Sequence, residues 1–170
     1  MTLPSTNDLY FVFHMLDSGL ISTYNIINWA DNLIEQIDIP PSWLCDLSVQ
    51  KLVSEQKKTI LETIGNDPTF PEPTGIDDFH IACLFLRYER RELSWATFLN
   101  LAGHYLDAIG SDCEVPYHYL TQYENAYFTE KAEANSKAQY LKDNDLRQWI
   151  EPARKLLNTF NSDIPNTTTS

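Results

Sequence analysis

Residues 77–86 read Asp-Asp-Phe-His-Ile-Ala-Cys-Leu-Phe-Leu, an almost unbroken apolar run behind two acidic residues. Acidic side chains are typical of the first turn of a helix, where they face the positive end of the helix dipole. A helix with apolar residues nearly all round has no face for water, so it is expected to be buried. The sequence therefore predicts a helix that begins at Asp77 or Asp78 and lies in the middle of the core.

The segment before this helix, residues 65–75, contains three prolines and two glycines. Proline interrupts helices because it has no backbone N–H, so this segment is a connector and the only plausible internal boundary. The 64 residues before it would be only marginally stable alone. We therefore expect one helical domain over residues 1–160, followed by a disordered polar tail at 161–170.

The other helices are predicted from their ends and from their apolar spacing. Capping residues and glycines flank segments in which apolar residues recur every three or four positions. The first helix begins near Ser5 or Asn7 and stops at Gly19. Ser22 caps a second helix that runs to about residue 37. Ser94 caps another, which ends just before a glycine at position 110.

Three further helices complete the prediction. One runs over residues 49–64, after a short turn that Ser42 caps, and one covers residues 117–138. The last begins at Asp143 or Asp145. Because no segment shows the alternation of a strand, the chain is expected to be all-α, a compact bundle or array of seven to eight helices.

The charge is uneven along the chain. Its 24 acidic and 12 basic residues give a net charge of −12, and residues 1–50 contain no lysine or arginine and carry −6 of it. A negative potential repels nucleic-acid phosphates and anionic membranes and attracts basic proteins. We expect a basic protein partner, without direct nucleic-acid or membrane binding; the alternative is that the acidity only keeps the chain soluble.

The cysteines indicate a reducing compartment. Cys45, Cys83 and Cys113 are odd in number, far apart and without Cys-x-x-Cys spacing. The first ten residues contain no basic segment of the kind that opens a secretion signal, and no apolar run approaches the roughly 18 residues that span a bilayer. The expected location is the cytoplasm.

Catalytic motifs are absent from the sequence: there is no phosphate-binding loop, dinucleotide fingerprint or nucleophile elbow, and the chain has only five glycines. We expect no cofactor and no enzymatic activity. The competing hypothesis is a metal-dependent enzyme, because two His-x-x-Asp units, His14 with Asp17 and His104 with Asp107, could supply four ligands. Each histidine also lies near a helix C-terminus. There, interaction with the last backbone carbonyls and with a nearby acid explains the histidine without a metal ion.

Five residues in the N-terminal third are the candidate partner-binding residues. They are Asp31, Glu35, Asp38, Trp43 and Asp46. Trp43 lies in a proline-flanked turn among these acids, and an aromatic anchor inside a polar rim is typical of a binding hot spot. The alternative for Trp43 is packing beneath the turn.

Three features resemble the small, acidic, often all-helical immunity proteins that bacteria make beside polymorphic or contact-dependent toxins. They are Gly-Leu-Ile-Ser at 19–22 leading to Trp-Ala at 29–30, Tyr-Glu-Arg-Arg-Glu-Leu-Ser-Trp at 88–95, and the first 50 residues without a base. The resemblance implies that the chain binds a basic toxin domain, commonly a nuclease, and blocks it with carboxylates. Immunity families share no binding-residue signature, so the five candidate residues are an inference from this chain's own charge. An adaptor that binds through residues 117–138 and a DNA mimic with several basic partners are the other binding hypotheses.

Overall fold

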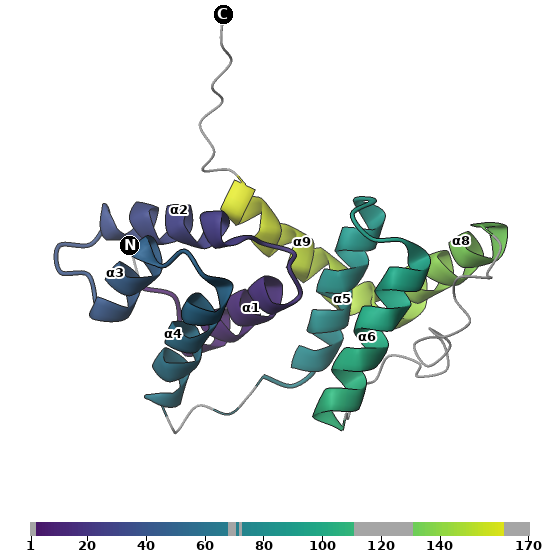
Figure 1. Ribbon diagram of the computed structural model, residues 1–170, viewed down its shortest axis with the longest axis horizontal. Coiled ribbons are helices and arrows are strands. Elements are labelled where there is room, and N and C mark those ends of the chain that lie inside the picture. The colour runs from purple at the N-terminus through teal and green to yellow at the C-terminus, as the bar shows by residue number, and fades with distance from the viewer. Residues whose placement is uncertain (1–2, 68–70, 72, 111–130, 162–170) are drawn as a thin grey trace, which may run out of the picture. The chain divides into compact units, whose positions relative to one another are not determined.

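The computed structural model describes residues 3–67, 71, 73–110 and 131–161 (Figure 1). In this part of the chain there are eight α-helices and one π-helical turn, and no strand. The predicted all-α fold is confirmed. Most of the predicted helix at 117–138 and all but the first residue of the predicted tail at 161–170 lie outside the described residues; Asn161 itself ends the last helix.

The chain divides into two compact units. Unit 1 contains Met1–Pro73 and Lys155–Ser170, and unit 2 contains Thr74–Arg154. The first boundary lies inside the predicted connector at 65–75, and the second falls within helix α9 (Arg147–Asn161). The single domain over residues 1–160 stays a prediction.

Unit 1 contains four helices from the first part of the chain. They are α1 (Thr6–Asp17), α2 (Thr23–Ile34), α3 (Ser42–Val49) and α4 (Val53–Gly65). Helix α1 packs against α4, α2 packs against α3, and α3 also contacts α4 (Figure 1). These packed faces give unit 1 its apolar core.

Two capping boxes define where α1 and α2 begin. The Ser5 hydroxyl accepts a hydrogen bond from the backbone N–H of Asp8, whose carboxylate accepts one from the Ser5 backbone N–H. Ser22 and Asn25 repeat this arrangement at the start of α2. Gly19 has a φ of 74°, which glycine adopts without strain, so the chain turns there as expected.

The expectation for the next two helices was wrong. Ser42 does not cap a turn, because it is the first residue of α3, and Pro41 precedes it with extended backbone. Helix α4 begins at Val53 rather than near residue 49, since Gln50 and Leu52 are extended and separate the two helices. The reason is a pair of hydrogen bonds between α4 and Gln50: the Gln56 side chain donates to the Gln50 carbonyl, and the Gln50 side chain donates to the Thr59 hydroxyl.

Unit 2 is built round α5 (Ile76–Glu89), ten of whose 14 residues are buried. Helix α6 (Trp95–Ile109), capped by Ser94, lies beside it (Figure 1). Helix α8 (Lys131–Tyr140) continues directly into the π-helical turn η2 (Leu141–Asp145). The prediction that the apolar run at 77–86 forms a buried helix is confirmed.

The start of α5 is fixed by a close approach to α9. Gly75 precedes α5 with a φ of 75°, and a Cβ atom there would overlap the indole ring of Trp149. The same indole packs edge-on against Phe79, with ring centroids 6.5 Å apart. Position 75 therefore needs glycine both for its backbone conformation and for the space that Trp149 occupies.

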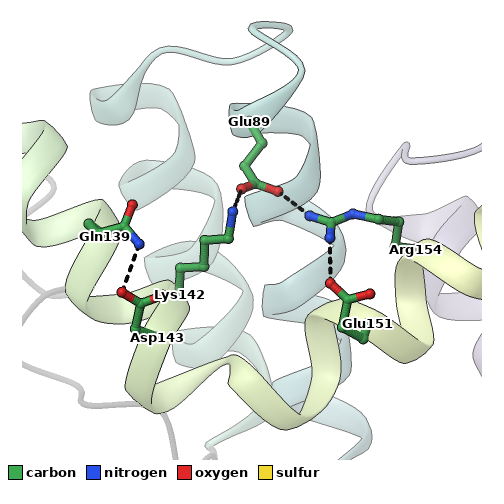
Figure 2. A network of polar contacts seen from close by, with 6 residues as sticks. All are labelled: Glu89, Gln139, Lys142, Asp143, Glu151 and Arg154. Atoms are coloured by element: carbon green, nitrogen blue, oxygen red, sulfur yellow. Dashed lines mark hydrogen bonds and ion pairs between the residues drawn. The ribbon is translucent and has the colours of Figure 1, made fainter.

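A branched ion-pair network links three elements of unit 2 (Figure 2). One carboxylate oxygen of Glu89, at the end of α5, accepts a hydrogen bond of 2.5 Å from Lys142 Nζ on η2. The other oxygen accepts one of 2.9 Å from the guanidinium of Arg154 on α9. Arg154 also pairs with Glu151 of its own helix. Glu89 thus fastens η2 and α9 to the end of α5.

Candidate functional site

The five predicted partner-binding residues belong to one helix pair. Asp31 lies in the last turn of α2, Glu35 directly follows that helix, and Asp38 lies in the connection to α3. Trp43 and Asp46 are on α3. Because α2 and α3 pack against each other (Figure 1), the structure places all five on neighbouring segments of unit 1.

The four acidic residues among them are exposed, whereas Trp43 is half-buried. The position of the acids follows from the helix period: α2 turns its apolar residues to the core and its charged residues to water. Its buried residues are Ile26, Ala30 and Leu33. We call Asp31, Glu35, Asp38 and Asp46 the α2–α3 acidic surface.

No ion pair involves the α2–α3 acidic surface within the residues that the structure describes. Two lysines of unit 1 have other partners, since Lys57 pairs with Asp17 and Lys58 lies 3.8 Å from Glu62. A carboxylate without a cation within reach keeps its full negative potential at the surface, weakened only by solvent and salt. This surface therefore presents an uncompensated charge.

Two of these acids also occupy unfavourable places along their helices. Asp31 is in the last turn of α2 and Asp46 in the last turn of α3. The C-terminal end of a helix carries partial negative charge, which favours cations and opposes carboxylates. Helix stability therefore does not account for an acid at either position.

The His-x-x-Asp units of the metal hypothesis lie in different units. His14 is buried at the end of α1 and Asp17 is paired with Lys57, whereas His104 and Asp107 are exposed on α6. Among the described residues, which include all four, there is no group of three or more His, Cys, Asp or Glu side chains that could hold a metal ion.

Several exposed apolar residues near the acidic surface were missed by sequence reasoning. Ile39 stands out in the α2–α3 connection, and Val49 and Leu52 flank the break between α3 and α4. The feature that could have identified them is their position on the helix. Val49 lies outside the stripe of buried residues that Leu44 and Leu47 form on α3. That signal could be used only once the limits of α3 were known.

Comparison with known proteins gave no match: no protein-family model, characterised protein or solved structure corresponds to this chain. Within the described residues, no helix combines the length and apolar character needed to cross a membrane.

Proposed function

We propose that this chain is an acidic protein-binding inhibitor, an immunity protein that works in the bacterial cytoplasm. In this proposal the α2–α3 acidic surface binds and neutralises a basic toxin domain, such as a nuclease. The observation that carries it is four exposed carboxylates on one packed helix pair and its connection, without an ion-pair partner in the described part of the chain.

The physical argument rests on what such carboxylates would gain from a partner. A nuclease groove is built to hold phosphates, so carboxylates spaced along two helices can take their place. Complementary charge accelerates the encounter of two proteins by about 10- to 1,000-fold at low ionic strength. Such an inhibitor needs no catalytic group and no cofactor of its own.

A charge-neutralised variant tests the proposal. It carries Asp31→Asn, Glu35→Gln, Asp38→Asn and Asp46→Asn, and its matched control carries an equal change at four exposed acids of unit 2. The control substitutions are Asp107→Asn, Glu133→Gln, Asp143→Asn and Glu151→Gln. Wild type, variant and control serve as baits in parallel in lysate of the native host, and bound proteins are identified by mass spectrometry.

The proposal predicts one basic protein that wild type and control retain and the variant loses. With that protein purified, the variant should associate about tenfold more slowly at low salt, and the control less than about threefold more slowly. The captured protein should be toxic when expressed alone and harmless when co-expressed with wild type. Equal slowing by variant and control, or a partner that is neither basic nor toxic, would contradict the proposal.

A further inference from the structure

The turn between α3 and α4 exposes three apolar side chains within five consecutive residues. Val49 is 70% exposed, Leu52 58% and Val53 44%. Single exposed apolar residues are ordinary on protein surfaces, but a contiguous group marks an interaction site. Chain connectivity alone keeps these three close together. We call residues 49–53, which carry these three side chains, the α3–α4 turn.

The turn is held in place from inside unit 1. The side-chain amide of Gln56, fully buried on α4, donates to the backbone carbonyl of Gln50 at 3.0 Å and to that of Thr23 at 3.3 Å. The Gln50 side chain in turn donates to the hydroxyl of Thr59 at 2.8 Å. These bonds fix the turn before any partner arrives, which reduces the entropy lost on binding.

The charges near the turn decide what can cover it. Asp46 precedes Val49 by one helical turn on α3, Glu55 is exposed in the first turn of α4, and Lys51 is exposed within the turn itself. The rest of the α2–α3 acidic surface lies on the helix pair that leads into the turn. A second copy of this chain or an anionic membrane would bring negative charge against negative charge. A basic protein surface would not.

We propose that the α3–α4 turn is the apolar anchor of the interface whose charged part is the α2–α3 acidic surface. The partner is then a basic protein surface with apolar side chains between its lysines and arginines. This inference rests on the proposed function and adds the chemistry of the contact. It also moves the anchor from Trp43, which is half-buried, to Val49 and Leu52, which are more exposed.

Methyl NMR of the labelled chain with three helical peptides of equal length tests the anchor. The first peptide contains leucine and lysine, the second alanine and the same number of lysines, and the third leucine and glutamate. We expect the leucine–lysine peptide to shift the methyl signals of Val49, Leu52 and Val53. It should bind about tenfold more tightly than the alanine–lysine peptide, as a truncated hot-spot side chain would predict.

Two serine variants distinguish binding at the anchor from non-specific apolar binding. Leu52→Ser should remove most of the difference in affinity between the two basic peptides. This variant should fold, because the Leu52 side chain is exposed. Leu61→Ser, at a leucine on α4 outside the turn that is 46% exposed, should leave the difference unchanged.

The contrary outcomes are distinguishable. Equal binding of both basic peptides with unmoved turn methyls would overturn the anchor but leave the charge-based function standing. Equal binding of the leucine–glutamate peptide would overturn the basic partner class. Signal shifts that depend on protein concentration without peptide would assign the turn to a second copy. If neither basic peptide bound, both the anchor and the proposed function would be wrong.

Discussion

Acidic side chains have opposite surroundings at the end of α5 in unit 2 and on the α2–α3 acidic surface of unit 1. At the end of α5, Glu89 places each carboxylate oxygen against a different cation (Figure 2). Glu92 pairs with Arg87 and Arg90. On the α2–α3 acidic surface of unit 1, no acid has such a partner within the described residues. The acids of the first group join helices, whereas those of the second contribute mainly an electrostatic field.

This difference shows that net charge alone does not identify a binding surface. Glu89 and Glu92 count equally toward the net charge of −12, yet each faces two neighbouring cations that oppose its field. Only acids that lack such neighbours remain available to a partner. This contrast between the two regions can be tested by substituting residues in each of them.

The largest expected effect comes from the close packing in unit 2. Gly75→Ala combines a positive φ with overlap onto Trp149, so it should lower the free energy of unfolding by about 2–4 kcal/mol. Gly110→Ala is the control, because its φ is also positive, at 62°, but none of the residues that the structure describes lies within 4 Å of the added Cβ. That control should lose only about 1 kcal/mol. Urea unfolding measures both, and similar losses would mean that the Trp149 contact adds nothing.

The same experiment tests whether the chain is one domain. Each unit has two tryptophans, Trp29 and Trp43 in unit 1 and Trp95 and Trp149 in unit 2. Fluorine NMR of fluorotryptophan-labelled protein follows them separately. One domain predicts that all four signals change at one urea concentration, which Gly75→Ala lowers for all. A shift confined to Trp95 and Trp149 would show two independent units.

A smaller loss is expected from the Glu89 network. Lys142 and Arg154 are about a third exposed, and ion pairs near the surface contribute about 0.2–1 kcal/mol each. Glu89→Gln should therefore lower the unfolding free energy by about 1 kcal/mol. The control, Glu62→Gln, breaks a more exposed pair with Lys58 and should lose only a few tenths. Equal losses would show that the Glu89 network stabilises the fold no more than an exposed ion pair does.

The smallest effect should have the opposite sign. Neutralising all four acids of the α2–α3 acidic surface removes mutual repulsion and two unfavourable helix-end charges, so stability should rise by about 0.3–1 kcal/mol at low salt. The gain should vanish in about 1 M salt, where the screening length is only about 3 Å. Thermal unfolding at the two salt concentrations measures it. A loss like that of Glu89→Gln would mean that these acids have a structural role, and the comparison would fail.

Local signals were enough to predict much of the fold. The capping serines before α1, α2 and α6, the left-handed glycines at 19 and 110, and the apolar run of α5 all use interactions within a few residues of each other. The same period that buries Ile26 and Leu33 placed Asp31 and Glu35 on the exposed side of α2. The exposure of these acids therefore followed from the sequence.

The break between α3 and α4 could not be predicted in this way. Residues 50–52 contain no glycine, proline or capping serine, and their extended backbone is held by Gln56 and Thr59. The α3–α4 turn was missed for that reason. Trp43 is a candidate anchor from the sequence because its residue type and acidic neighbours are visible there, whereas its partial burial depends on packing.

Gln56 also bears on how unit 1 assembles during folding. Its amide joins a carbonyl 33 residues earlier, at the start of α2, to one six residues earlier, at the end of α3. Burying this amide before both carbonyls are in place would leave polar N–H groups dehydrated and unbonded, which is unfavourable by about 1–3 kcal/mol. Intermediates in which α4 packs against only one of α2 and α3 are thereby disfavoured. The consequence is a folding transition in which α4 docks onto α2 and α3 together rather than onto one and then the other.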